Sequence, residues 1–519
     1  MSGGGAVAAG SQHTVQAGMH AFDLGGNAVD AAVASTLMAC VAEPLLTGLG
    51  GGGLAVVKMG SDVKVCDLFS TFPGSGGSRG ERSAMDVVTL DFGPTLQTFR
   101  VGAPSVAPPG MPGGLHALHR RYGKVDLPLL AQPAIRMSID GVPVTGGFER
   151  VCKLLWPIQQ RDPQSAHMFG PSGYPLRAGD RFFCPSLGET ISRFANEEPT
   201  LFTTGDLGRS IVDTVNCHAL LNQDDLVHCR PRFSDAIRYQ YNETTTVWLP
   251  GPPSCAGLLV LKALRLHQNR NRNHSPMGVE EVLALIGVMS DVERVQGGDF
   301  LQNLFRSGFV DQFLKNLDQL PSSDPQTICN TDKMPGNTTH ISVVDSLGNA
   351  IGITQSLGET AGLVVPGTGL LLNNFLGEDD VNPSQIHHEP GDRLMTMCCP
   401  CIVETKNGLF VMGSGGSSRI RSAILHGIVY LVEHGMAPGK AAAAPRAHVE
   451  QGAANVESDG RPPGVIRDLQ QRLEGLRVFE GPNMYFGGLH IAGRLNGEFV
   501  GGGDKRRSGA FGSSPTGPA

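Results

Sequence analysis

Two adjacent threonines, Thr338 and Thr339, stand where a turn-rich segment, residues 333–337, gives way to alternating apolar residues. A threonine at the start of a strand is ordinary. If the peptide bond before Thr338 were cut, however, this one residue would carry both a hydroxyl nucleophile and a free α-amine. The amine can act as the base, so no separate His or Asp is needed. The pattern indicates either a nucleophile released by cleavage or a surface hairpin that begins with two threonines.

The residues after these threonines predict a β-hairpin that would hold Thr338 in place. Ile341 and Val343 fall on one face of an extended chain, and the residues between them fall on the other. Turn formers follow at residues 346–349, and residues 350–354 resume the alternation. The first threonine would therefore sit at the end of a buried strand.

The sequence of this hairpin, Thr-Thr-His-Ile-Ser-Val-Val-Asp-x-x-Gly-Asn-Ala from Thr338, resembles the start of the small subunit in the γ-glutamyltranspeptidase family of N-terminal-nucleophile hydrolases. Members of that family cut their own precursor before the first threonine of the motif. The resemblance implies a large subunit of residues 1–337, with a linker at about 322–337, and a small subunit of residues 338–519. It also implies an α+β fold, the four-layer αββα sandwich, in which the two subunits form a single intertwined globule.

The resemblance extends over nearly the whole chain through further motifs, at residues 25–34, 101–115, 251–257 and 503–509. Hydrophobic periodicity predicts the elements around them. We expect helices over 15–24, 27–41 and about 419–433, a mostly helical stretch over 126–320, a strand over 368–374, and a hairpin over 401–412 around the Asn407-Gly408 turn.

The resemblance assigns the rest of the catalytic machinery to small residues. Gly416 and Ser417 match the family's oxyanion positions, and backbone N–H groups at a glycine-rich helix start suit that task. Thr354 and Ser356 match the strand residues that face the nucleophile, where a hydroxyl can bond the Thr338 amine. Without the threonine motif, the same glycine-rich segment would fit a plain helix cap.

The residues that would bind the substrate match the family less closely. The resemblance places them at Phe69, Asn373, Asn374, Glu378, Asp379, Thr396 and Met397. Either of the two acids would hold the α-amine of the substrate. Phe69 stands where transpeptidases have an Arg that grips the α-carboxylate, and an apolar ring cannot replace a charged, bidentate fork. Gly358 replaces an Asn, Phe375 replaces a polar Gln or Glu, and Thr396-Met397 replaces a Ser-Ser pair.

Composition excludes several other classes of function. A net charge of −7 gives no electrostatic footprint for nucleic acid or for an anionic membrane. The first residues show neither a basic nor an apolar leader segment, so we expect a cytoplasmic protein. The 11 cysteines are mostly scattered, which is typical of reduced, buried thiols. A metal site at Cys398-Cys399-Pro400-Cys401 lacks a second ligand pair, and we expect no metal and no cofactor.

These observations predict an autoprocessing, Thr-dependent amide hydrolase or acyltransferase, similar to γ-glutamyltransferase and glutathione hydrolase. It would cleave γ-glutamyl or related small amides through an acyl-enzyme. Two alternatives stay open: an acylase for a non-glutamyl amide, and an unprocessed pseudoenzyme that serves as a binding or structural protein. The expected partners are the small amide and the two subunits of one precursor, and a homo-oligomer of such heterodimers is also compatible with the sequence.

Overall fold

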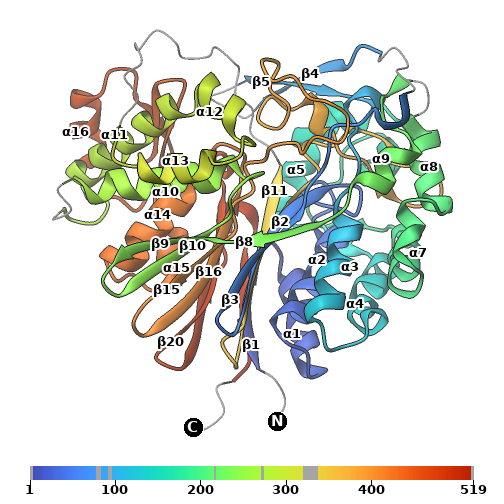
Figure 1. Cartoon of the computed structure of the whole chain (residues 1–519), viewed down its shortest axis with the longest axis horizontal. Coiled ribbons are helices and arrows are strands. Elements are labelled where there is room, and N and C mark those ends of the chain that lie inside the picture. The colour runs from blue at the N-terminus through green and yellow to red at the C-terminus, as the bar shows by residue number, and fades with distance from the viewer. Residues whose placement is uncertain are drawn as a thin grey trace.

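A computed structural model describes residues 4–77, 83–91, 96–215, 218–270, 274–319 and 337–515. In these ranges the chain has an α+β fold, as expected, and two larger antiparallel sheets form its centre (Figure 1). Residues 322–336 of the expected linker lie outside the described residues, whereas its last residue, Asn337, lies within them.

The first sheet has seven strands and carries Thr338. Across the sheet these are β22 (Ala510–Ser513), β1 (Gly5–Ala9), β11 (Thr338–Asp345), β12 (Ala350–Ser356), β2 (Gly52–Met59), β3 (Asp62–Leu68) and β8 (Arg232–Asp235). Because β11 lies between β1 and β12, segments from before and after Asn337 share one set of ladder hydrogen bonds. The two sides of the expected cut are therefore interleaved in one sheet.

The second sheet has six strands. They are, across the sheet, β21 (Glu498–Gly502), β20 (Gly488–Leu495), β16 (Gly408–Gly415), β15 (Cys401–Glu404), β10 (Thr245–Leu249) and β9 (Ile237–Asn242). β11 packs against β16 and β20, so the two sheets lie face to face. Val344 and Val411 belong to the apolar core between them.

Helices cover the outer faces of both sheets (Figure 1). The helices α1 (Gln12–Asp23), α2 (Ala28–Ala42), α3 (Met111–Tyr122) and α4 (Leu127–Asp140) lie on the side of the first sheet, and α10 (Cys255–Gln268), α11 (Val279–Val295) and α14 (Arg419–Ile428) on the side of the second. α2 is buried along its whole length, and its small residues allow it to pack closely against β11 and β12. Ile341 and Val343 face this helical layer.

The remaining elements surround these layers. They are the helices α5 (Gly146–Gln159), α6 (Pro163–Phe169), α7 (Pro185–Asn196), α8 (Asp206–Val215), α9 (Gln223–His228), α12 (Gly298–Asn303), α13 (Phe309–Lys315), α15 (Pro438–Ala443) and α16 (Val465–Arg472), and the strands β4 (Asp86–Asp91), β5 (Leu96–Val101), β6 (Val142–Pro143), β7 (Arg181–Phe182), β13 (Val364–Val365), β14 (Leu370–Leu371), β17 (Ala447–Glu450), β18 (Ala453–Glu457) and β19 (Arg477–Phe479).

The hairpins β11–β12 and β15–β16, the first two helices and the helix that reaches residue 433 are confirmed, but two other expectations need correction. The stretch 126–320 contains the strands β6–β10 as well as helices. Their residues alternate weakly. β8 and β9 are edge strands whose side chains are largely exposed, so each is defined by its pairing, β8 with the distant β3 and β9 with the adjacent β10. The expected strand over 368–374 reduces to β14, and the helix to residue 433 ends as a π-helical turn, Val429–Glu433.

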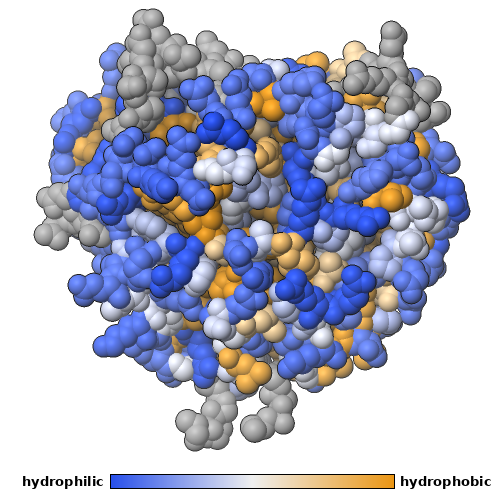
Figure 2. All heavy atoms as spheres, viewed as in Figure 1, coloured by the Kyte–Doolittle hydropathy of each residue, from blue (hydrophilic) through white to orange (hydrophobic). Residues whose placement is uncertain are grey.

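The surface and the cysteines agree with the composition. Hydrophilic side chains cover most of the face drawn in Figure 2, with smaller apolar areas between them. The nine described cysteines are free and buried. Cys399 and Cys401 lie in the apolar core of the second sheet. In the described ranges, no helix combines the length and the apolar character that a bilayer crossing needs.

Candidate active site

Thr338 begins β11 directly opposite Ser356, the last residue of β12. Its hydroxyl donates to Ser356 Oγ at 3.3 Å, and Ser356 Oγ in turn donates to the carbonyl oxygen of Asn337 at 2.6 Å. Thr338 and Asn337 are both buried. The hydroxyl is thus linked through one side chain to the carbonyl of the bond that precedes it, an arrangement suited to attack on that bond.

A small pocket opens beside Thr338. It is lined by Phe69, Thr338, Ser356, Phe375, Glu378, Asp380, Val381, Thr396, Met397, Cys398, Ser417 and Ile420. Phe69 and Phe375 form one wall, with their ring centroids 4.6 Å apart. None of these described lining residues is a Lys or an Arg. The described lining of the pocket therefore combines apolar rings with acidic side chains.

Two buried acids, Glu359 and Glu378, lie beside this pocket, and we call them the acidic pair. Burial, followed by the neighbouring Asp380 and Asp379, raises the pKa of Glu378 to about 8. Burial and Glu378 raise the pKa of Glu359 well above its usual value. Glu359 Oε2 and Glu378 Oε1 have no hydrogen-bond partner among the described residues. Burial and the neighbouring acids therefore disfavour the ionised form of both carboxyls.

Gly358 explains how Glu378 reaches the pocket. A Cβ on Gly358 would lie 1.8 Å from Glu378 Oε1 and 2.1 Å from Asn374 Oδ1, and the φ of 68° at this position favours glycine. The absence of a side chain at residue 358 therefore makes room for the Glu378 carboxyl.

The turn from β16 into α14 contains Gly416 and Ser417. Ser417 has a left-handed φ of 49°, and its hydroxyl donates to the carboxylate of Asp380. The Gly416 and Ser417 amides donate to no residue in the described ranges. Since a Cβ on Gly415 would lie 1.9 Å from the Thr338 carbonyl oxygen, this turn is pressed against the start of β11. Free amides there are compatible with an oxyanion role.

Thr354 lies two residues before Ser356 on β12, further from the bond between Asn337 and Thr338. Its hydroxyl contacts His340 Nδ1 at 2.8 Å, and His340 Nε2 contacts Ser342 Oγ at 2.8 Å. Burial lowers the pKa of His340 well below its usual value, so the imidazole is neutral. In the uncut chain Thr354 thus belongs to a polar cluster between the sheets, and Ser356 alone of the two contacts Thr338.

The paired asparagines brace the backbone around the pocket. Asn373 bonds the Ala107 N–H and the carbonyls of Gly50 and Ala107. Asn374 Oδ1 accepts from the Glu359 N–H at 2.9 Å. Neither lines the pocket in the uncut chain, and their contact with substrate stays a prediction.

The acidic stretch 378–380 divides between the pocket and the surface. Glu378 and Asp380 line the pocket. Asp379 instead forms an ion pair with Arg100 at 3.0 Å, and the Arg100 side chain is 52% exposed. Asp380 was missed by sequence reasoning, because three consecutive acids carry no signal for which of them turns inward.

No cation lies beside Phe69 in the described lining of the pocket. Arg393 lies behind Phe69, but its guanidinium donates to the Phe69 carbonyl and pairs with Asp67 at 3.3 Å. The wall of the pocket at Phe69 is therefore apolar, and a role for this position in carboxylate binding stays a prediction.

Arg507 reaches Thr338 from the other side. Its Nη1 donates to the Thr338 carbonyl at 3.2 Å, and burial and Arg419 lower the pKa of Arg507 to about 10. Nothing in the sequence connected these residues, because 169 positions separate them.

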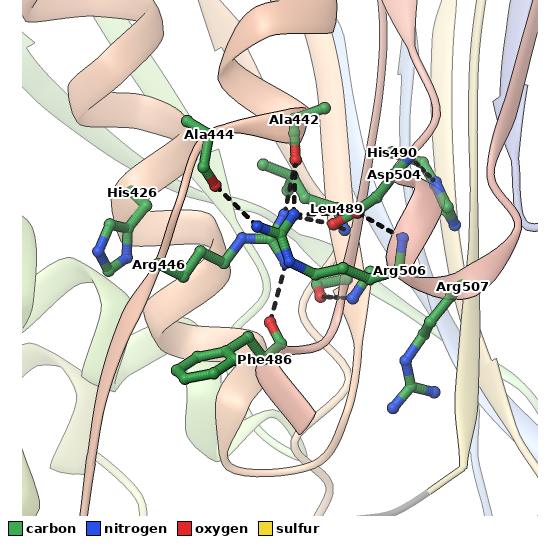
Figure 3. Close-up of polar contacts among 12 residues, drawn as sticks. His426, Ala442, Ala444, Arg446, Phe486, Leu489, His490, Asp504, Arg506 and Arg507 are labelled. Carbon is green, nitrogen blue, oxygen red and sulfur yellow. Dashed lines mark hydrogen bonds and ion pairs between the residues drawn. The ribbon is translucent and has the colours of Figure 1, made fainter. Parts of the chain in front are cut away.

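A buried set of charges holds the segment that carries Arg507. We call Arg446, Glu457, Asp504 and Arg506 the arginine cluster. Asp504 accepts from Arg446 and Arg506, and Arg506 also pairs with Glu457. Figure 3 shows the Arg446 and Arg506 guanidinium groups enclosed by backbone carbonyls, with Arg507 directed away from them. The cluster anchors the turn from which Arg507 extends.

Comparisons with known proteins agree with this geometry. A protein-family profile described as "Gamma-glutamyltranspeptidase" matches residues 14–513. The chain is 28% identical over 501 residues to "Acylase ACY 1 proenzyme" of Pseudomonas sp. (strain SE83), covering 93% of this chain and 89% of that protein. It is 27% identical over 481 residues to "Glutathione hydrolase proenzyme" of Pseudomonas aeruginosa, covering 86% of this chain and 83% of that protein.

A solved structure shows the same fold. The crystal structure of cephalosporin acylase from Bacillus halodurans superposes with a TM-score of 0.80 over 98% of this chain and 96% of that chain, at 22% sequence identity. Both curated relatives are named as proenzymes, which agrees with an amidohydrolase that is made as a precursor.

Proposed function

This chain belongs to the gamma-glutamyltranspeptidase family, and from that premise we propose that it is a self-cleaving amide hydrolase or acyltransferase whose nucleophile is Thr338. Cleavage would divide it into residues 1–337 and 338–519, arranged as the intertwined four-layer αββα sandwich of N-terminal-nucleophile hydrolases. The interleaving of β1 and β11 in one sheet supports two subunits that stay together after the cut.

One observation carries the proposal: the hydroxyl chain from Thr338 through Ser356 to the Asn337 carbonyl. Attack of Thr338 Oγ on that carbonyl carbon would break the bond to the Thr338 nitrogen and form an ester, and the hydroxyl proton would pass to the nitrogen. Water would then split the ester, which leaves a carboxylate on Asn337 and restores the hydroxyl. Thr338 would then have a free amine beside its nucleophile.

The same groups would serve an external amide. The Thr338 amine takes the hydroxyl proton, the hydroxyl attacks the substrate carbonyl, and the proton passes to the leaving amine. The Gly416 and Ser417 amides would hold the oxyanion, since neither N–H donates to an acceptor in the described chain. Water or a second amine then resolves the acyl-enzyme, giving hydrolysis or transfer.

The pocket lining favours acyl groups that carry an amine and lack a carboxylate. Glu378 and Asp380 suit an ammonium group, whereas Phe69 and Phe375 offer no donor to a carboxylate. We therefore propose weak γ-glutamyl turnover and better turnover of less polar amides. This substrate range makes an acylase for a non-glutamyl amide the second candidate, and one of its relatives is named an acylase.

Replacing Thr338 by Ala tests the proposal. The purified native chain should separate into fragments of 337 and 182 residues (519 − 337 = 182), and the Thr338→Ala chain should stay at 519 residues and turn over no amide. Intact mass would locate the cut. A native chain that stays whole would favour the pseudoenzyme alternative, and a Thr338→Ala chain that is still cut would assign the nucleophile elsewhere. The cytoplasmic location and the oligomeric state stay predictions.

A further inference from the structure

Glu359 is a buried acid that contacts the residue whose carbonyl the proposed reaction attacks. Its Oε1 accepts from the Asn337 N–H at 3.0 Å, and the side chain is 0% exposed. Its Oε2 has no partner among the described residues. Burial of the Glu359 carboxyl costs desolvation free energy that an apolar side chain of similar size would avoid. We therefore expect this acid to have a function.

Both polar backbone groups of Asn337, its N–H and its C=O, are hydrogen-bonded to side chains. Glu359 takes its N–H, and Ser356 donates to its C=O at 2.6 Å. These two contacts fix the orientation of the carbonyl relative to Thr338, whose own carbonyl is fixed by Arg507. Side chains therefore hold the backbone on both sides of the bond between Asn337 and Thr338.

The loop that presents Glu359 is itself rigid. The Gly358 N–H donates to Ser356 Oγ at 2.9 Å, so the two residues that hold Asn337 are joined through one short turn. Asn374 fixes the Glu359 backbone by accepting its N–H at 2.9 Å. The Glu359 backbone is thus fixed by a contact that does not involve Asn337.

We propose that Glu359 is a positioning residue for self-cleavage: its carboxyl oxygen holds the Asn337 N–H so that the Asn337 carbonyl carbon stays in front of the Thr338 hydroxyl. The inference rests on the proposed function. Glu359 takes no part in the bonds that form or break, which are the ester and the amide described above. Its contribution is the orientation that an intramolecular attack requires.

The protonation state of Glu359 predicts which replacement will work. Glu378 faces it across the turn, and Arg419 and Arg507 are the cations that act on it; burial and Glu378 outweigh them and raise its pKa, so the carboxyl is neutral. A neutral carboxyl accepts an N–H through its carbonyl oxygen, as the amide of Gln does. Glu359→Gln should therefore keep the function, whereas Glu359→Met keeps the volume but loses the acceptor.

The experiment follows the cleavage of purified precursor over time by gel and intact mass. We expect Glu359→Gln to be cut at close to the native rate, and Glu359→Met to be cut about tenfold more slowly or worse. Glu359→Asp, which withdraws the acceptor by one methylene, should also be slow. Glu281→Met is the matched control, because it replaces a buried Glu on α11 that contacts neither Asn337 nor the pocket.

Folding is checked separately in the uncut Thr338→Ala background, where each Glu359 variant should melt close to its parent. Glu281→Met loses a buried pair with His434 and should melt lower, which separates lost stability from slowed cleavage. Cleavage of Glu359→Met or Glu359→Asp at the native rate overturns the inference. Equal slowing by Gln and Met also overturns it, because that result would mean that the acid proton and not the acceptor matters. If Glu359→Met does not fold, the Asp and Gln variants decide. If the native chain is not cut at Thr338, the proposed function fails first.

Discussion

The arginine cluster and the acidic pair are two buried charged regions that differ in whether their charged groups have partners. In the cluster, Asp504 and Arg506 both have ion-pair partners that are themselves buried. In the pair, Glu359 and Glu378 face one another across Gly358, and each has an oxygen without a partner in the described chain. A fully paired set of charges stabilises a fold only modestly, but losing one member is costly. A buried acid with an unsatisfied oxygen is typical of a site that binds a ligand or takes part in a reaction.

The largest expected difference is in stability. Asp504→Ala leaves the Arg446 and Arg506 charges buried without their shared partner, so we expect it to lower the free energy of unfolding by about 3–5 kcal/mol. Glu378→Met removes a buried acid that has an unsatisfied oxygen, and should be neutral or stabilising. Urea unfolding in the Thr338→Ala background measures both. A larger loss from Glu378→Met than from Asp504→Ala would reverse the comparison.

The second prediction tests whether the acidic pair and its neighbours select an amine. Three 4-nitroanilides form a matched set: γ-glutamyl, 4-aminobutyryl, which lacks only the α-carboxylate, and glutaryl, which lacks only the α-amine. Because the pocket has acids and no described cation, 4-aminobutyryl should exceed glutaryl in kcat/KM by about tenfold to over a hundredfold. γ-Glutamyl should fall between them.

Glu378→Gln provides the control for this series and should reduce the difference between the amine and carboxylate substrates, because a bound ammonium group favours the ionised form of Glu378 and Gln cannot ionise. Glutaryl as the best substrate would contradict the assignment and would indicate that a cation such as Arg419 enters the pocket after cleavage. No turnover of any of the three in a correctly cut chain would place the true substrate outside this series.

The third prediction uses pH to separate the two regions. The pKa of Glu378 is raised from 4.5 to about 8, so between these values the folded chain holds a proton that the unfolded chain loses. The free energy of unfolding should fall as pH rises through this window, by up to about 1.4 kcal/mol per pH unit. Glu378→Gln should flatten this slope.

The arginine cluster should act at the other end of the pH scale. Burial alone would raise the pKa of Asp504, but Arg446 and Arg506 together hold it below its usual value. Its stabilising effect is complete above that usual value and is lost only as pH falls through the lowered pKa. Urea unfolding from about pH 2 to pH 8 would check both signs, and a native chain that becomes steadily more stable from pH 5 towards pH 8 would contradict the first.

The smallest effect is expected at Asp379, which lies beside the acidic pair but faces the surface. Its ion pair with Arg100 is partly exposed, and such pairs contribute about 0–1 kcal/mol. Asp379→Asn should therefore change neither stability nor the order of the three anilides by a clear margin. A large loss of turnover would instead identify Asp379 as the residue that binds the amine, the role that the sequence left open between it and Glu378.

Local pattern was enough to predict part of the fold. The alternation after Thr338 and the helical spacing of residues 27–41 predicted β11, β12 and α2, because burial of one face repeats with the period of the element. β8 and β9 escaped prediction because their side chains stay largely exposed. β8 is defined by its pairing with β3, which is distant in the sequence, and β9 by its hairpin with β10.

The local pattern of the sequence by itself determined that Thr338 begins a strand of a hairpin after a turn-rich segment. The resemblance to the family, and not short-range order, predicted that Ser356 faces Thr338 and that Phe69 stands where transpeptidases have an Arg. Only the tertiary structure decided that Asp380 and not Asp379 turns inward, that Glu359 holds Asn337, and that Arg507 reaches the Thr338 carbonyl. Such contacts depend on which loops meet in space and on the burial of each charge, and neither is written in the local pattern of residues.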